Sequence, residues 1–157
     1  MKITVMEGKR LPGEEPELVV YCHKADRNIE AICKYAGNMG SYLIGINGND
    51  TCRLEPEDIL YFETVDGKVF AYLKEKVWQV GKSLEALENQ YSGGMGIDYF
   101  RVSKSCMVNL KYVEHLTSTI GNRIIAHMEN GEMVMISRHY AKLLRAYLKA
   151  GKGDEDV

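Results

Sequence analysis

One stretch near the middle of the chain carries most of the information about its fold and function: Tyr99-Phe100-Arg101-Val102-Ser103-Lys104-Ser105-Cys106-Met107-Val108-Asn109-Leu110. It opens with two aromatic residues that suit a strand and then sets basic and hydroxyl side chains close together. We expect an extended segment over 100–102, after which Ser103 and Ser105 can cap a short turn of helix whose amides bind phosphate. A strand-to-helix junction with solvated basic side chains would give the same pattern, so the stretch alone leaves both interpretations open.

Basic residues gather in the C-terminal third of the chain. Residues 100–149 contain eight Lys and Arg against three acids, whereas residues 50–99 contain five bases against ten acids. The net charge of the whole chain is −2, so this sorting is a local feature. A basic region is what contact with phosphates requires. A second basic cluster, at the start of the last predicted helix, consists of Ser137-Arg138-His139-Tyr140 with Lys142 and Arg145.

Alternation of apolar and polar residues, interrupted by turn signals, predicts a chain that is mainly β with short helices. The dipeptides Asp66-Gly67 and Asn130-Gly131 predict tight hairpins, the second of type I′. Ser83 is expected to cap a short helix. Strands are expected over residues 2–6, 17–22, 42–46, 59–65, 69–73, 77–80, 112–117, 123–128 and 132–136, helices over 26–40, 83–91 and 137–150 with Gly151 as the stop, turns at 47–50 and 121–122, and a flexible loop at 93–96.

The chain divides mildly near residues 47–51. Residues 1–49 are expected to form a small α/β extension that serves in dimerisation or regulation, because so few residues bury little core of their own. Residues 50–151 form the main domain, and residues 152–157 form a flexible tail.

Several classes of protein find no support in the sequence. No apolar run approaches the roughly 20 residues of a membrane span, and no signal peptide is visible, so we expect a cytoplasmic protein with free thiols. No serine-hydrolase, Walker or metalloprotease motif is present, so no enzyme activity, cofactor or small-molecule substrate is expected. The cysteines that we expect to be buried or half-buried are Cys22, Cys33, Cys52 and Cys106.

The histidines give no metal signature. The four of them, His23, His115, His127 and His139, share no zinc-like spacing with one another or with a cysteine. His115 and His127 fall on predicted strands that could pair across the turn at Gly121-Asn122. We therefore expect no metal site.

Taken together and in order, these motifs resemble the LytTR DNA-binding family. The resemblance covers about residues 50–150 and is most specific at Phe100-Arg101-Val102-Ser103-Lys104-Ser105 with Val108-Asn109-Leu110. The other matching segments are Ile59-Leu60-Tyr61-Phe62-Glu63, Asp66-Gly67-Lys68-Val69-Phe70, Ser83-Leu84-Glu85-Ala86-Leu87-Glu88, Asn130-Gly131-Glu132 and Ile136-Ser137-Arg138.

The resemblance implies an elongated stack of small antiparallel sheets whose loops enter successive major grooves of double-stranded DNA. Three positions typical of the family's DNA contacts fall on Lys68, Lys104 and Arg138. The planar fork of Arg138 suits a guanine edge, whereas the two lysines can read bases or clamp phosphates. Positioning or structural contacts are expected from Arg101, Ser103, Ser105, Asn109 and Lys142, and Asn109 can instead tie the turn together internally.

The resemblance also implies a transcription regulator. Family domains usually follow a receiver domain, and the roughly fifty residues before the match are too few for one, so the sequence resembles the stand-alone regulators. A second copy of the chain and a small membrane protein are candidate partners. The alternative is a protein–protein adaptor on the same fold with weak or no DNA binding. A stacking platform for RNA is disfavoured, because the aromatic residues look like core residues.

Overall fold

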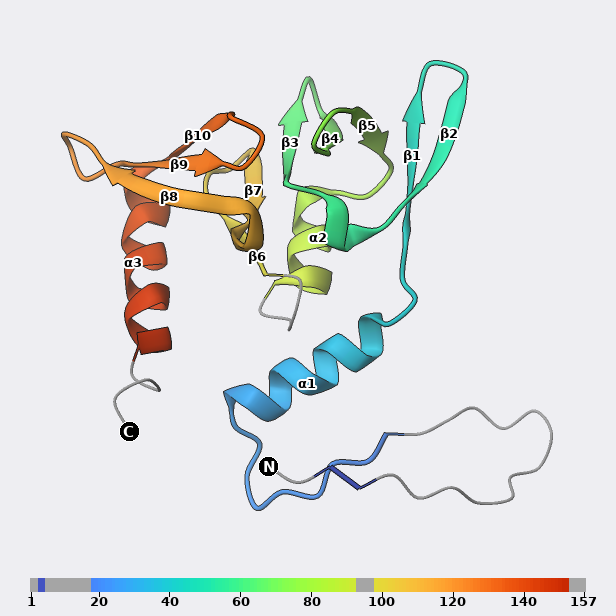
Figure 1. The fold of residues 1–157 in the computed structure, drawn as a ribbon, viewed down its shortest axis with the longest axis vertical. Helices are drawn as coiled ribbons and strands as arrows, with labels where there is room; N and C mark the ends of the chain where they lie inside the picture. Colours follow the sequence, from blue (N-terminus) through green and yellow to red (C-terminus); the bar gives the residue numbers. More distant parts are fainter. Residues whose placement is uncertain (1–2, 5–17, 93–97, 153–157) are drawn as a thin grey trace.

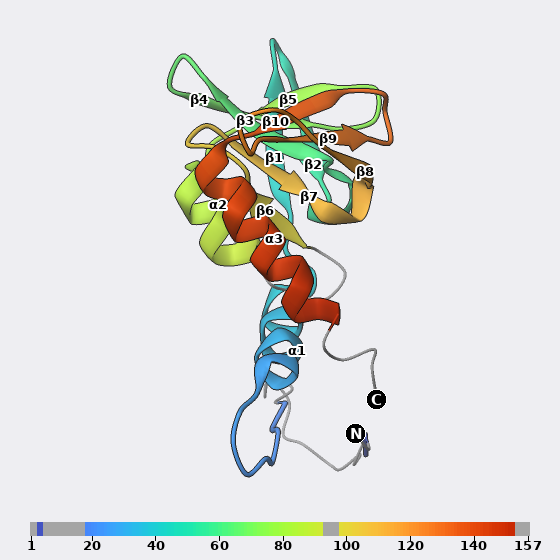
Figure 2. The same ribbon diagram turned by 90° about the vertical axis from the view of Figure 1, so that its left-hand side faces the viewer.

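The computed structural model describes residues 3–4, 18–92 and 98–152. Figures 1 and 2 show the strands gathered at one end of the molecule and helix α1 at the other. The elements are α1 (Arg27–Asn38), β1 (Leu43–Asn47), β2 (Asp50–Leu54), η1 (Pro56–Asp58), β3 (Tyr61–Val65), β4 (Lys68–Tyr72), β5 (Val77–Val80), α2 (Leu84–Tyr91), β6 (Tyr99–Arg101), β7 (Cys106–Asn109), η2 (Leu110–Tyr112), β8 (Val113–Ser118), β9 (Ile124–Met128), β10 (Met133–Ile136) and α3 (Arg138–Lys152).

The strands form two antiparallel sheets, which confirms the predicted mainly β class. The larger sheet has seven strands in the order β2-β1-β5-β4-β3-β7-β6, and the smaller has three in the order β10-β9-β8. Every pairing in both sheets is antiparallel. Helix α2 packs against the large sheet and α3 against the small sheet, whereas α1 lies apart from both (Figure 1).

Strands β3 and β7 separate two hydrophobic cores, because successive side chains point to opposite faces of a sheet. Phe62 and Met107 point into the first core, between the large sheet and α2, where Leu87 joins them. Tyr61 and Val108 point into the second core. That core is closed by residues of the small sheet and α3, among them Ile124, Ala126, Met128, Ile136, Ala141 and Leu144.

The turn chemistry explains the hairpins. Asp66 and Gly67 both have positive φ, of 50° and 75°, as a two-residue type I′ turn requires. The type I′ prediction for Asn130-Gly131 is wrong, because only Gly131 has a positive φ, of 87°. The Gly131 N–H donates to the Met128 carbonyl at 3.0 Å, and the Met128 N–H to the Glu132 carbonyl at 2.9 Å. Glu129, Asn130 and Gly131 thus form a three-residue loop that ends in a left-handed glycine.

The N-terminal part differs most from expectation. Helix α1 forms as predicted, with Asp26 accepting a hydrogen bond from the Ile29 N–H at 2.9 Å. The predicted strand over 17–22 is wrong, because residues 18–22 form no strand. Strand β2 was not predicted, yet it pairs with β1 across the turn at 47–50. The predictions for strand 2–6, loop 93–96 and the end of the tail fall wholly or mainly outside the described residues.

Helix α3 runs to Lys152, one residue past the predicted stop at Gly151.

The cysteine prediction holds for Cys106, which is buried, and Cys52, which is half-buried, but Cys22 and Cys33 are exposed. None of the helices in the described ranges is both long and apolar enough to span a membrane.

Candidate DNA-binding surface

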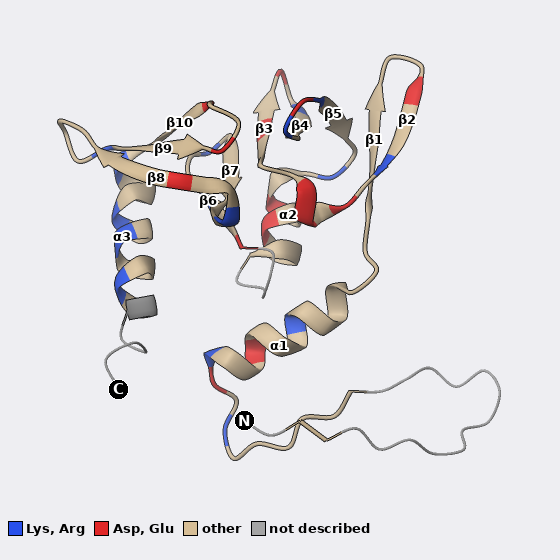
Figure 3. Ribbon diagram, viewed as in Figure 1, with Lys and Arg blue, Asp and Glu red and all other residues tan. Residues whose placement is uncertain are grey.

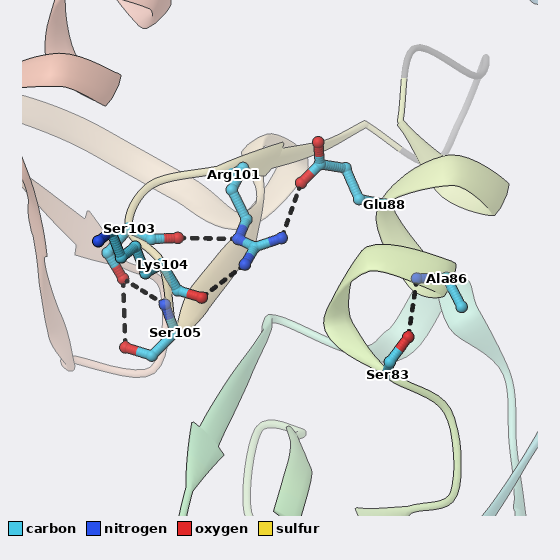
Figure 4. A network of polar contacts seen from close by, with 7 residues as sticks. All are labelled: Ser83, Ala86, Glu88, Arg101, Ser103, Lys104 and Ser105. Atoms are coloured by element: carbon cyan, nitrogen blue, oxygen red, sulfur yellow. Dashed lines mark hydrogen bonds and ion pairs between the residues drawn. The ribbon is translucent and has the colours of Figure 1, made fainter. Parts of the chain in front are cut away.

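The stretch over residues 99–110 folds as strands β6 and β7 with a hairpin turn between them. The predicted turn of helix is wrong, because Cys106 already begins strand β7. Ser103 does accept a hydrogen bond, from the Ser105 N–H at 3.2 Å, but this bond closes a turn and caps no helix (Figure 4). The backbone amides here are therefore not arranged as a helical phosphate site.

Arg101 holds this turn in shape. Its Nε donates to the Ser103 carbonyl at 2.8 Å, and its Nη2 donates to the Lys104 carbonyl. Its Nη1 forms an ion pair with Glu88 Oε2 at 3.0 Å (Figure 4). The side chain is only 21% exposed. Arg101 is thus a positioning residue, and it fixes the backbone that presents the exposed Lys104.

The position of Glu88 follows from the residue at which helix α2 begins. The Ser83 hydroxyl accepts from the Ala86 N–H at 3.1 Å, which caps the helix (Figure 4). This start places Glu88 about one turn further along α2, where it meets Arg101. No motif predicts this pairing, since the two residues are 13 positions apart.

Backbone hydrogen bonds join the turn to the two neighbouring segments. The Ser105 carbonyl accepts from the Thr64 N–H of β3 at 2.7 Å, and the Val102 carbonyl accepts from the Ser137 N–H at 3.1 Å. Strand β3 leads into the turn before Lys68, and Ser137 immediately precedes Arg138. The segments that carry the three predicted contact positions are therefore tied together within one part of the fold.

The three positions are exposed in a turn or at the first residue of an element. Lys68 is the first residue of β4, and Arg138 is the first residue of α3; both are exposed, as is Lys104. A Cβ atom at Gly121 would lie 3.3 Å from the Arg138 Nη2, so the β8–β9 turn packs closely beside the guanidinium. The positive φ of Gly121, 84°, also favours glycine at this position.

The remaining predicted residues divide into surface and core. Ser105 and Lys142 are exposed and Ser103 is half-buried. Asn109 is 0% exposed. Its Nδ2 donates to the Ile59 carbonyl and its Oδ1 accepts from the Lys111 N–H, each at 3.2 Å. Asn109 is therefore removed from the DNA-contacting set, and it has the internal role that the sequence left open.

Charges separate across the molecule. Figure 3 shows Lys and Arg along one side of α3, and Asp and Glu on α2 and the neighbouring η1. Near the β6–β7 turn, burial and, to a smaller extent, the nearby Glu63 raise the pKa of the Cys106 thiol to about 12. This thiol therefore stays protonated at neutral pH, and its role is packing. Within the described ranges, no group of three or more His, Cys, Asp or Glu side chains could hold a metal ion.

Comparison with known proteins identifies the domain. A family model for the LytTr DNA-binding domain matches residues 49–149. The sensory transduction protein LytT of Bacillus subtilis is 27% identical over 101 residues, which cover 64% of this chain and 41% of that protein. The LytT protein of Bacillus cereus is 28% identical over 93 residues, covering 59% and 37%. The chain thus spans about two fifths of the length of these curated relatives.

A solved structure agrees with the family match. A LytTr DNA-binding domain from Bacillus cereus superposes with a TM-score of 0.63 at 21% identity, over 69% of this chain and 98% of that one. At this identity the superposition shows the shared fold. The family model covers well over half of the chain, including all the segments that carry the basic positions. The chain therefore belongs to the LytTR family of DNA-binding domains.

Proposed function

We propose that this chain is a transcription regulator that binds specific promoter sequences by placing turns in the major groove. The observation that carries the proposal is that three exposed basic residues, Lys68, Lys104 and Arg138, lie on segments that backbone hydrogen bonds join together. Side chains presented from ends of secondary structure can enter a groove while the sheets remain outside it.

Each basic residue has a distinct proposed role. Arg138 reads a guanine edge, because its guanidinium can donate two hydrogen bonds to O6 and N7. Lys68 and Lys104 contact bases or phosphates. Ser103, Ser105 and Lys142 support the duplex backbone from the same region, and Arg101 acts indirectly by shaping the turn that carries Lys104.

The adaptor alternative would have been favoured if these side chains were buried or paired internally. Lys68, Lys104 and Arg138 are exposed instead. Arg101, in contrast, is engaged in internal contacts that shape the β6–β7 turn. The exposure of these three basic side chains therefore supports binding to an anionic ligand such as DNA over an adaptor role.

Replacing Lys104 by alanine is expected to weaken binding to all DNA sequences about equally. If Lys104 contacts a phosphate, the slope of log affinity against log salt should fall by about 1, because about one fewer counterion is released. Fluorescence anisotropy over a salt series with promoter fragments measures both quantities. Lys74→Ala is the matched control, since Lys74 is also exposed but lies beyond the end of β4 that is opposite Lys68. An unchanged slope with altered base preference would instead make Lys104 a base reader, and an unchanged affinity would remove it from the surface.

The N-terminal extension is proposed to mediate dimerisation. Ile44 and Ile46 on β1 are 46% and 50% exposed, and Val77 on β5 is 39% exposed. They share one face of the large sheet, because Ile46 lies opposite Gln79 and Val77 is two residues from Gln79. The small sheet and α3 cover the other half of this face. An apolar patch of this kind marks an interaction site, and we assign it to a second copy of the chain.

The double variant Ile44→Glu/Ile46→Glu is expected to be monomeric, whereas the unchanged chain is dimeric at micromolar concentration. Two buried carboxylates would oppose association. Analytical ultracentrifugation distinguishes the two states, and Leu148→Glu, which alters a 41% exposed residue on α3, should leave the dimer intact. A monomeric unchanged chain would refute this assignment and make the small membrane protein the remaining candidate for the patch.

A further inference from the structure

The small sheet has one covered face and one open face. On β9, Ile124, Ala126 and Met128 point into the second core, whereas Ile125 and His127 point to the other side and are only half-buried. Figure 1 shows β8, β9 and β10 side by side above α3. The open face therefore presents side chains from all three strands.

One row on this face joins a histidine pair to a methionine. The register sets His115 of β8 opposite His127 of β9, and His127 opposite Met133 of β10. Side chains in such positions have Cβ atoms about 4.5–5.5 Å apart. Met135 lies two residues beyond Met133 and thus on the same face. We call His115, His127, Met133 and Met135 the His–Met cluster.

The methionines of this cluster are unusually exposed. Met133 is 66% and Met135 is 51% exposed, although a methionine side chain normally gains from burial. Met133 lies opposite His127, whose imidazole ring stacks on that of His115 with centroids 4.0 Å apart and an interplanar angle of 11°, and Met135 lies opposite Ile125 in the next row. Flexible thioethers next to imidazoles form a set of soft donors without a carboxylate, which does not favour the hard cations Mg²⁺ and Ca²⁺.

A neighbouring side chain holds the ring of His127. His127 Nε2 and the Thr117 hydroxyl lie within hydrogen-bond distance, at 2.9 Å. Metal-binding histidines usually form such a bond through the ring nitrogen that does not bind the metal, because the bond fixes the tautomer and the orientation of the ring. Thr117 would hold Nε2 and leave Nδ1 of His127 for a metal ion.

We propose that the His–Met cluster binds a soft monovalent metal ion, Cu(I) or its analogue Ag(I). His127 supplies an imidazole nitrogen, and Met133 and Met135 supply thioether sulfurs. His115, stacked on His127, supports the ring. Thioether and imidazole donors select Cu(I) over the divalent ions that prefer oxygen. The members of this cluster share no spacing in the sequence, because they come from three strands that meet only in the sheet.

The test is a titration of the full chain with Ag(I), which needs no reducing conditions. Exposed and half-buried thiols would bind Ag(I) strongly, so the background is Cys22→Ser/Cys33→Ser/Cys52→Ser, checked for an unchanged fold by its NMR spectrum. We expect one equivalent of Ag(I) to shift the methyl resonances of Met133 and Met135 and the ring resonances of His127. Zn²⁺ at the same concentration should leave the two methyl resonances in place.

A matched pair of variants decides the assignment. Met133→Leu/Met135→Leu keeps the apolar volume but removes both sulfurs, and it should lower the Ag(I) affinity by at least about tenfold. Met39→Leu, which alters a methionine that is 71% exposed and lies at the end of α1, should leave the affinity unchanged. The proposal is overturned if no equivalent binds, if the resonance shifts fall outside the cluster, or if both variants bind equally well.

Discussion

An Arg138→Ala variant is expected to lose the preference for one base pair of the binding site while it retains binding to other DNA. The planar guanidinium can donate two parallel hydrogen bonds to a guanine edge, and such a contact contributes about 1–3 kcal/mol of discrimination. The structure leaves this side chain exposed at the first residue of α3 and packs Gly121 beside it.

The measurement compares affinities for a bound fragment and for fragments with single base changes. With Arg138→Ala, one position should become indifferent to sequence, while the other positions keep their penalties. Arg138→Lys is an informative second variant, since it keeps the charge but loses the planar fork. Arg145→Ala, which alters a half-buried residue two turns along α3, serves as the control. A uniform loss across all fragments would show that Arg138 contacts only phosphate.

An Asn109→Ala variant is expected to be less stable and yet to bind DNA normally. The side chain is fully buried and bonds to the Ile59 carbonyl and the Lys111 N–H. Its removal takes a buried partner from each group, which costs about 1–3 kcal/mol in the free energy of unfolding. Urea denaturation measures this loss. Ser105→Ala, at an exposed position four residues earlier, should change stability by no more than about 0.5 kcal/mol.

DNA affinity separates the structural role of Asn109 from a contact role. Below the unfolding transition, the folded Asn109→Ala variant should bind its DNA site within about twofold of the unchanged chain, because the buried side chain makes no contact with DNA. Twofold corresponds to about 0.4 kcal/mol of binding free energy. Full stability combined with weakened binding would return Asn109 to the DNA-binding surface.

Local signals in the sequence predicted much of the fold. Asp66-Gly67 predicted a hairpin turn, which forms with positive φ at both residues, and Ser83 predicted the start of α2 because its hydroxyl can accept a backbone hydrogen bond. These features depend on a few neighbouring residues. The split of β3 between two cores, in contrast, needed knowledge of what covers each face of the sheet.

The predictions from the sequence were wrong where contacts between distant residues determine the structure. Residues 18–22 have strand-like composition, but no neighbouring strand pairs with them among the described residues. Strand β2 has few apolar residues and forms through its pairing with β1. The β6–β7 turn owes its shape to Arg101, which Glu88 holds from another element. Side-chain chemistry identified the basic positions, but only the fold separates the exposed Lys104 from the engaged Arg101.

The central claim is that this chain recognises a specific DNA sequence through Lys68, Lys104 and Arg138. The most direct test is selection from a random duplex library by the purified chain at about 150 mM salt, where non-specific attraction is largely screened. We expect enrichment of one sequence motif by the unchanged chain, and no enrichment by the triple variant Lys68→Ala/Lys104→Ala/Arg138→Ala. Equal enrichment by the triple variant, or no motif with the unchanged chain, would contradict it.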